Sequence, residues 1–324
     1  MKPKVIFRAD AGKDIGLGHF TRCLALAEAI HLKFNCFFAT VNPSETQKTA
    51  VKNVCKGLIS LPDNKSHFTE FLNMLDGSEI VVLDNYFFDP DYQKKIKDKG
   101  CKLVCIDDLA DKHFYADAII NHTPGAEHFK YDKEKYTKVY AGIHFAMLRD
   151  EIHKAHKKLT APQELKRGVV CFGGADIDNH TLKTILYLKE TLPDLVKLEV
   201  VIGALYKHKN ILYRTTGKMP DVVVSQNLSA KKLAYWIKQY DFSVVPASTL
   251  SIECAMIHTP LFLVQTADNQ SRNYKFMIKY GCAMPLDKIK YYTFDRGQAM
   301  MQTQAALFQT NIQENLLRVF EEIL

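Results

Sequence analysis

The feature that most constrains the fold of this chain is the alternation of short apolar, β-branched segments with longer amphipathic ones. The short segments predict strands at 5–7, 36–41, 80–84, 102–106 and 118–120, and again at 169–172, 198–202, 222–224, 242–245 and 261–265. The longer segments predict helices at 20–32, 89–99, 179–190, 230–239, 250–257 and 269–280. Strands separated by helices form βαβ units, so the sequence predicts an α/β fold with parallel sheets.

The chain also divides near its middle. Its 324 residues exceed a comfortable single core and suit two domains. Residues 148–164 are highly charged and lack strand character, and a strand followed by a glycine turn starts again after them. We therefore predict Rossmann-like domains at 1–147 and 165–324 with a linker at 148–164, and residues 311–324 as a helix closing the second domain. Two such domains facing each other hold a ligand in the cleft between the carboxyl ends of their strands.

Composition excludes several classes of protein. Charged residues make up 24% of the chain and apolar residues 47%, which excludes a disordered chain, a collagen and a coiled coil. The net charge of +7 is spread along the sequence, which is typical of a solvated basic surface but also suits a protein that handles an anionic small molecule. We expect no nucleic-acid partner and no cofactor. The oligomeric state stays open, and a monomer is compatible with the sequence.

Cysteine usage and hydropathy indicate the compartment. The eight cysteines lie mostly in apolar segments, without a CxxC pair or the spacing of a zinc site, which indicates reducing conditions and no metal centre. No apolar stretch approaches the roughly 18–20 residues of a membrane span, and the first residues do not read as a secretory signal. We therefore expect a cytoplasmic protein without a stable membrane anchor.

The first chemical motif, AGKDIGLGHFTRCLALAEAI, follows the first predicted strand. Its glycines, among them Gly16 and Gly18, permit a tight turn and a close approach of the backbone to a ligand, and the N–H groups at the helix start favour an anion. The spacing differs from the dinucleotide motif GxGxxG, so a nicotinamide cofactor is weakly indicated. His19 stands where the loop becomes helix, and both a structural and a catalytic role fit that position.

A second turn, CFGGADIDN, follows the first strand of the second half. Gly173 and Gly174 form the turn, and Asp176 or Asp178 can cap the helix after it. This pattern suits an anion-cradling loop and, equally, an ordinary tight turn between a strand and a helix.

A third motif spans residues 244–283. Ser248 and Thr249 lie at the start of a helix, with Glu253 one turn further on, and the next strand ends in ADNQ, which contains Asn269 and Gln270. Hydroxyls and free amides at a helix start suit a pyrophosphate, and a nearby carboxylate suits the diol of a ribose. Serine and threonine at helix starts are also ordinary caps, so this alternative stays open.

Two patterns are interpreted as structural. Asp89-Pro90-Asp91 resembles the DxD motif of metal-dependent glycosyltransferases, but proline in a first turn predicts the beginning of a helix. His153 and His156 lie one helical turn apart among lysines without a third ligand, so we interpret them as surface residues.

The motifs occur in a characteristic order from RADAGKDIGLGHFTRCLALA through LDNYFFD, CIDDLAD, AMLRDE, CFGGADIDN and VIGALYKHK to ASTLSIECAMIHTPLFLVQTADNQ. In this order the chain resembles the UDP-sugar hydrolases of pseudaminic acid biosynthesis, which release UDP from UDP-2,4-diacetamido-2,4,6-trideoxy-β-L-altropyranose. These are similar in turn to GT-B glycosyltransferases, including the enzyme that adds N-acetylglucosamine in peptidoglycan synthesis. The resemblance covers about residues 4–283 and implies a GT-B-like fold with a UDP-sugar as partner.

The resemblance also implies roles for individual residues. His19 matches the histidine proposed as the general base that activates water. The residues that match positions facing the nucleotide sugar are Tyr86, Gly173, Gly174, Ser248, Thr249, Glu253, Asn269 and Gln270. Asn85 departs from the family, which often has histidine there, and an amide can hydrogen bond but cannot titrate.

The implied reaction is attack of water on the anomeric carbon with inversion and departure of UDP. The leaving group needs little acid assistance and no metal when helix amides and hydroxyls spread its charge. Two rival interpretations remain. One is a GT-B glycosyltransferase with an acceptor other than water, and the other is a non-catalytic nucleotide-sugar-binding module.

Overall fold

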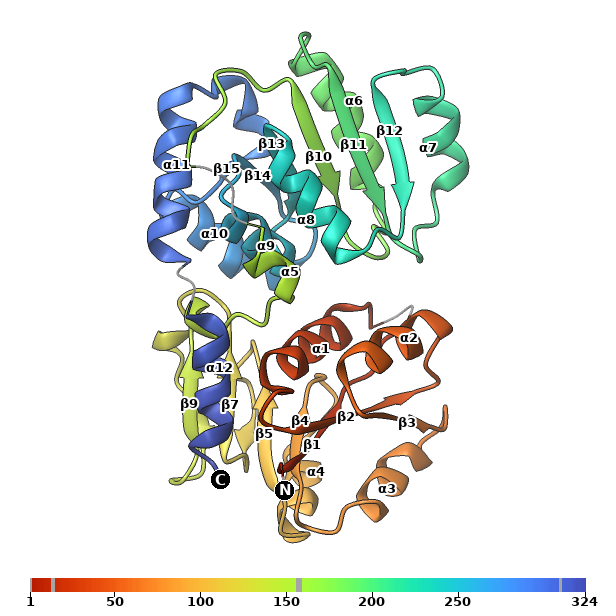
Figure 1. Cartoon of the computed structure of the whole chain (residues 1–324), viewed down its shortest axis with the longest axis vertical. Coiled ribbons are helices and arrows are strands. Elements are labelled where there is room, and N and C mark those ends of the chain that lie inside the picture. The colour runs from red at the N-terminus through yellow and green to blue at the C-terminus, as the bar shows by residue number, and fades with distance from the viewer. Residues whose placement is uncertain (1, 13–14, 156–158, 309–310) are drawn as a thin grey trace. The chain divides into compact units, whose positions relative to one another are not determined.

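A computed structural model describes residues 2–12, 15–155, 159–308 and 311–324. The chain forms two compact units, the first comprising Met1–Leu148 with Thr310–Leu324 and the second Arg149–Gln309. Each unit is built on its own parallel sheet with helices packed beside it (Figure 1). The predicted α/β class with two Rossmann-like domains is therefore confirmed.

The first unit contains a seven-stranded sheet in the order β3-β2-β1-β4-β5-β7-β9, with every strand pair parallel. The strands of this sheet are β1 (Lys4–Arg8), β2 (Asn35–Val41), β3 (Gly57–Leu61), β4 (Ile80–Leu83), β5 (Lys102–Ile106), β7 (Ala118–Asn121) and β9 (Lys138–Ala141). The helices are α1 (Gly18–Ile30), α2 (Glu45–Val54), α3 (Ser66–Asn73), α4 (Pro90–Asp98) and α12 (Ile312–Glu321). The short strands β6 (His113–Phe114) and β8 (Asp132–Lys133) pair with each other, and short 3-10 turns lie at Ala126–His128 and Ile143–Phe145.

The strand order of this sheet reverses at β1. The chain proceeds from β1 to β2 and β3 on one side and then returns to β4 on the other side of β1. In open parallel sheets, ligands bind outside the carboxyl ends of the strands at such a switch point. The loops after β1 and β4 are therefore the places where the fold of this unit offers a site.

The second unit contains a six-stranded parallel sheet in the order β12-β11-β10-β13-β14-β15. Its strands are β10 (Arg167–Cys171), β11 (Lys197–Ile202), β12 (Val222–Gln226), β13 (Phe242–Pro246), β14 (Leu261–Val264) and β15 (Met284–Pro285). Its helices are α5 (Asp150–His153), α6 (His180–Thr191), α7 (Lys209–Thr216), α8 (Ala230–Gln239), α9 (Thr249–Ile257), α10 (Ser271–Lys279) and α11 (Phe294–Leu307), with 3-10 turns at Asp268–Gln270 and Leu286–Tyr291. The switch point lies between β10 and β13, so the loops after these two strands define the corresponding site.

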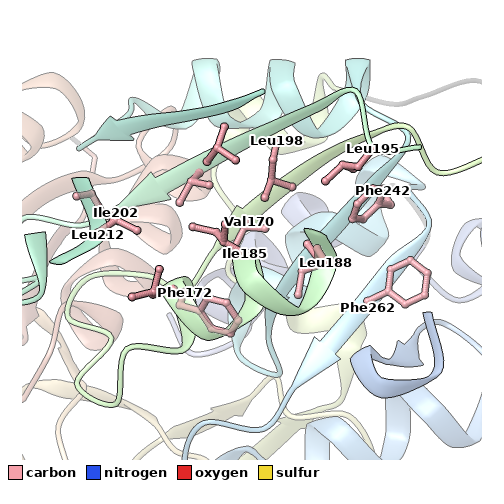
Figure 2. Close-up of a cluster of buried hydrophobic side chains, with 14 of the residues drawn as sticks. Val170, Phe172, Ile185, Leu188, Leu195, Leu198, Ile202, Leu212, Phe242 and Phe262 are labelled. Atoms are coloured by element: carbon pink, nitrogen blue, oxygen red, sulfur yellow. The ribbon is translucent and has the colours of Figure 1, made fainter. Parts of the chain in front are cut away.

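Apolar residues between the sheet and its helices hold each unit together. In the second unit, Ile185 and Leu188 of α6 pack against the sheet residues Val170 and Leu198, and all four side chains are fully buried (Figure 2). The first unit has an equivalent core that includes Ile6, Val81 and Leu103. Because parallel strands are buried on both faces, their polar functional groups gather at the strand ends.

The C-terminal helix belongs to the first unit, so its predicted assignment to the second unit is wrong. α12 packs against α1, with the Phe320 and Phe34 ring centroids 5.7 Å apart, and the Glu322 carboxylate accepts a hydrogen bond from Tyr140 of β9 at 2.7 Å (Figure 1). The apolar face of α12 is buried by residues of the first half of the chain. A helical pattern reveals such a face but not its partner.

The predicted linker is mostly part of the second unit. Its α5 packs against α8 and α9, the Ala161 N–H donates to Gln298, and the Pro162 carbonyl accepts from the Tyr292 hydroxyl. Residues 148–155 and 159–164, the described part of this segment, carry no strand, as predicted. No helix among the described residues is long and apolar enough to cross a membrane.

We predict that Phe320→Ala destabilises the first unit by about 3–5 kcal/mol, because it removes a fully buried ring from the contact between α12 and α1. Hydrogen exchange should become faster in α1 and α12 and stay unchanged in α6 and α9. Leu324→Ala is the matched control, since that side chain is 66% exposed. Faster exchange confined to the second unit would contradict the assignment of α12.

Candidate active site

The start of α1 follows a glycine-rich stretch and has no side-chain cap. Gly12 and Gly16 exchange two backbone hydrogen bonds, and Gly16 has φ +78°, a conformation that favours glycine. The N-cap residue Leu17 makes no side-chain cap. A Cβ added at Gly18 would meet nothing within 4 Å, so packing within the described chain does not require glycine there.

His19 lies in the first turn of α1 and is held by a carboxylate from β4. Its Nδ1 lies 2.7 Å from Oδ1 of Asp84, the residue directly after that strand. Asp84 is 1% exposed and His19 is 8% exposed. Nε2 of His19 makes no hydrogen bond within the described part of the chain and is not among its buried unpaired atoms. One ring nitrogen is therefore fixed and the other is available.

Arg22, one helical turn after His19, binds the same carboxylate. Its Nε donates to Asp84 Oδ2 and its Nη2 to Oδ1, both at 2.6 Å, which is a two-point arrangement. Burial alone would raise the pKa of Asp84, but the Arg22 guanidinium and the His19 hydrogen bond outweigh it and lower this pKa to about 2. Asp84 is thus an ionised carboxylate near neutral pH.

Three further polar residues lie near Arg22, namely Asp108, Tyr86 and His122. Asp108 accepts hydrogen bonds from Arg22 Nη1 at 3.2 Å and from the Tyr86 hydroxyl at 3.1 Å. The Tyr86 ring stands edge-on to His19, with centroids 4.9 Å apart, and is 44% exposed. His122, after β7, is buried, and its burial together with the charge of Arg22 lowers its pKa to about 4. We call His19, Arg22, Asp84, Tyr86 and Asp108 the His19 cluster.

Asn85 is buried, and its side chain holds the backbone of the loop after β1. Its Oδ1 accepts a hydrogen bond from the Asp10 N–H at 2.7 Å, and the residue is 8% exposed. Its Nδ2 is a buried nitrogen without a partner in the described chain, and Asn85 lines a cavity of about 20 Å³ together with Arg22 and Asp107. The predicted site residue therefore lies beside the His19 cluster and ties the β1 loop to the β4 loop.

The glycine loop after β10 packs on a second glycine loop. A Cβ at Gly203 would lie 2.3 Å from the Gly174 carbonyl oxygen, so Gly203 allows the two backbones to meet. The Asp176 carboxylate accepts from the His180 and Thr181 N–H groups, both at 2.8 Å. These amides at the start of α6 are thus already paired, and the loop can offer an anion only the backbone around Gly173 and Gly174.

The N-cap of α6 differs from the predicted one. Asn179, in the left-handed conformation, accepts from the Leu182 N–H at 3.4 Å, while Asp176 caps from further upstream and Asp178 does not cap.

The turn after β13 presents hydroxyls at the start of α9, as predicted. Ser248 is the N-cap, with its Oγ accepting from the Leu250 N–H at 3.4 Å. Asn273 of α10 donates to the Ser248 carbonyl at 3.2 Å and to Ser251 Oγ at 2.9 Å, which fixes the turn. The Thr249 hydroxyl makes no hydrogen bond within the described chain. Thr249 is therefore the hydroxyl of this turn best placed for a ligand.

Glu253 of α9 is buried and paired with Arg149, a residue to which the sequence assigned no role. Arg149 Nε donates to Oε1 at 2.8 Å and Nη2 to Oε2 at 2.6 Å. Glu253 is 4% exposed, whereas the Arg149 side chain is 25% exposed. Burial opposes the charge of Arg149, but the Glu253 carboxylate outweighs it and raises the pKa of Arg149. A ligand that reaches Glu253 meets a carboxylate already oriented by a guanidinium.

The two amides after β14 have different environments. Asn269 is exposed, whereas Gln270 bonds back to its own loop, with Oε1 accepting from the Thr266 N–H at 2.9 Å. Both follow the carboxyl end of β14, next to β13 in the sheet.

The two patterns interpreted as structural can be compared with the structure. Asp89 is the N-cap of α4 and accepts from the Tyr92 N–H at 2.7 Å, with Pro90 in the first turn, which confirms the interpretation as a helix start. His153 lies in α5, and His156 falls outside the described residues. Within the described ranges, no group of three or more His, Cys, Asp or Glu residues could hold a metal ion.

The residues that hold the predicted site residues in place lie within the sequence motifs. The motifs do not show which of these residues pair with each other. Asp84 stands in LDNYFFD, Asp108 in CIDDLAD and Arg149 in AMLRDE, and Arg22 follows His19 on the same helix face. An ionisable residue directly after a buried strand, as at Asp84 and Asp107, was the available signal. Nothing local indicated which of these residues meet.

Comparisons with known proteins show which fold the chain has and which proteins it is similar to. No protein-family model matches the chain. It is 25% identical over 289 residues, 85% of its length, to an uncharacterized protein of Methanocaldococcus jannaschii, and it spans only 58% of that protein. The structure of MurG from Acinetobacter baumannii superposes with a TM-score of 0.64 at 13% identity, covering 99% of this chain and 100% of MurG. The chain thus has the two-domain GT-B fold.

A second relative is an enzyme of defined activity. Over 195 residues, 58% of this chain and 66% of the relative, the chain is 27% identical to the UDP-2,4-diacetamido-2,4,6-trideoxy-β-L-altropyranose hydrolase of Campylobacter jejuni. This similarity, together with the fold, confirms the resemblance seen in the ordered motifs: the chain has the GT-B fold and is similar in sequence to that hydrolase.

We predict that Arg149→Met lowers the free energy of unfolding of the second unit by about 3–5 kcal/mol, because it leaves the buried Glu253 carboxylate without its partner. Replacing both residues with methionine should restore most of the loss, since no buried charge then remains. Urea denaturation of the two variants and the parent measures this difference. Equal losses in the single and double variants would contradict the pairing.

Proposed function

We propose that this chain is a metal-independent UDP-sugar hydrolase that releases UDP from a UDP-linked 2,4-diacetamido-2,4,6-trideoxy sugar. The similarity to the Campylobacter jejuni hydrolase supports this substrate class. The observation that carries the proposal is the placement of His19 at the carboxyl edge of the first sheet, with one ring nitrogen held by Asp84 and the other unpaired within the described chain.

The second unit is proposed to bind the nucleotide. The start of α9 offers the Thr249 hydroxyl and backbone amides for the diphosphate, and Gly173 and Gly174 offer backbone near it. Glu253 is proposed to accept hydrogen bonds from the ribose, and Asn269 and Gln270 to face the nucleotide sugar. Tyr86 of the first unit and the loop of Gly16 and Gly18 are proposed to contact the sugar.

The proposed reaction needs one base. A water molecule gives a proton to Nε2 of His19 while its oxygen bonds to the anomeric carbon. The bond between that carbon and the phosphate oxygen breaks at the same time, and UDP leaves with the electron pair. Because the attack comes from the face opposite UDP, the product has inverted configuration. Backbone amides and hydroxyls that spread the charge of UDP replace the metal ion that other enzymes use.

The direct test is to incubate the protein with the UDP-linked diacetamido sugar in the presence of EDTA and to follow UDP and free sugar. We expect both products in equal amounts without any acceptor. UDP release that depends on an added acceptor would favour the glycosyltransferase alternative, and binding without release would favour a nucleotide-sugar-binding module. Loss of activity with EDTA and recovery with magnesium would contradict metal independence.

We predict that His19→Asn lowers kcat by about 10²–10⁴-fold and leaves the affinity for UDP nearly unchanged. Asparagine keeps a hydrogen-bonding group of similar size but cannot accept the proton of water. Steady-state kinetics and calorimetry with UDP measure both effects, and a variant with near-normal kcat would refute the role of His19.

We predict that Glu253→Ala weakens UDP binding by about 1–3 kcal/mol through the loss of a charge-assisted hydrogen bond to the ribose. Titration calorimetry with UDP and with inorganic pyrophosphate separates this from general damage, since only UDP carries the ribose. An unchanged affinity for UDP would show that Glu253 serves Arg149 alone.

A further inference from the structure

The environment of His19 determines which of its two ring nitrogens carries the proton. Asp84 Oδ1 lies 2.7 Å from Nδ1, and the carboxylate cannot donate because it is ionised. Nδ1 must therefore be the donor, and in the neutral imidazole Nε2 is then the acceptor. Arg22 Nη2 also lies 3.1 Å from Nδ1, although both atoms are donors. They are neighbours because both donate to the same oxygen, Oδ1 of Asp84.

We propose that Asp84 and Arg22 are positioning residues for His19: Asp84 fixes the tautomer in which Nε2 accepts a proton, and Arg22 holds Asp84 in place as a carboxylate. This inference rests on the proposed function, in which His19 is the general base. Asp84 and Arg22 act through the imidazole and are not proposed to touch the substrate.

Arg22 also influences where the proton taken from water remains. Because the guanidinium donates to both oxygens of Asp84, the carboxylate keeps its charge and does not take the proton from His19. The proton lost by water therefore stays on the imidazole, and Asp84 stabilises the resulting cation by its charge. The proton balance is one proton from water to Nε2 and none to Asp84.

Several charged and polar groups surround His19. Asp84 faces it from β4, Tyr86 from the following loop and Arg22 from its own helix, while Asp108 and His122 lie behind Arg22. The thiol of Cys23 also donates to Asp84 Oδ2, at 3.6 Å. Two carboxylates outweigh one guanidinium, and His122 adds no charge because its pKa is lowered to about 4.

The test is Asp84→Asn, read by kinetics and by ¹⁵N NMR of the histidine side chains. The asparagine amide can donate to Nδ1, which moves the proton to Nε2 and removes the base. We expect kcat to fall by about 10²–10⁴-fold with UDP affinity unchanged, and the His19 resonances to report protonated Nε2 in place of protonated Nδ1. A variant that keeps both the parent tautomer and the parent kcat would overturn the proposal.

Glu79→Gln is the matched control. Glu79 is a carboxylate of the same strand region, 1% exposed, which precedes β4 at its opposite end and pairs with Lys4 at 3.1 Å. It should cost stability without changing the tautomer of His19 or kcat. A change in tautomer in this control as large as in Asp84→Asn would show that any buried carboxylate has the effect, and would also overturn the proposal.

The parent protein itself provides a second measurement if Asp84→Asn does not fold. In the neutral form of His19, the spectrum must show protonated Nδ1 and unprotonated Nε2, and the opposite tautomer overturns the inference without any variant. Different results would refute this inference and the proposed function. A parent that releases no UDP refutes the hydrolase, whereas an active parent with an active, correctly folded Asp84→Asn variant refutes only the positioning role.

Discussion

The burial of parallel strands on both faces is the constraint on which the rest of this structure depends. Strands such as β1, β4, β10 and β13 are almost entirely buried, as expected of parallel strands covered on both faces. Chemistry can therefore be placed only at their ends, and the strand order selects which ends. The reversal beside β1 brings the β1 and β4 loops together, and the reversal between β10 and β13 does the same in the second unit.

Both candidate sites use the same electrostatic device, a buried carboxylate held at two points by an arginine. Asp84 with Arg22 and Glu253 with Arg149 have donor–acceptor distances of 2.6–2.8 Å and carboxylates exposed by less than 5%. A buried ion pair of this kind contributes little net stability, because desolvation offsets the attraction. In the first unit the same carboxylate also contacts the imidazole of His19, which is the orientation that the proposed role of Asp84 requires.

Several elements of the fold were predictable because they depend on local patterns. All ten predicted strands and the predicted helices are present, and Asp89 caps α4 as its sequence indicates. The missed elements include β3, β9, α2, α3, α7 and α11. Most of them are short and only partly buried, which weakens their apolar periodicity. The longer α11 buries a glycine and a glutamine, Gly297 and Gln304, on its inner face, so its apolar pattern is interrupted. The positions of His19, Ser248, Thr249 and Glu253 after strand ends were also predictable, because a strand followed by a helix start is readable from the chain.

The sequence by itself determined the fold class, the division into two domains and the loops that carry chemistry, because periodicity, glycine turns and helix caps are properties of neighbouring residues. Only the tertiary structure decided which distant residues meet. Asp84 lies 62 residues from Arg22, Glu253 lies 104 residues from Arg149, and α12 packs on α1 across almost the whole chain. These pairings follow from strand order and from the burial of apolar faces, and neither is encoded in any short segment.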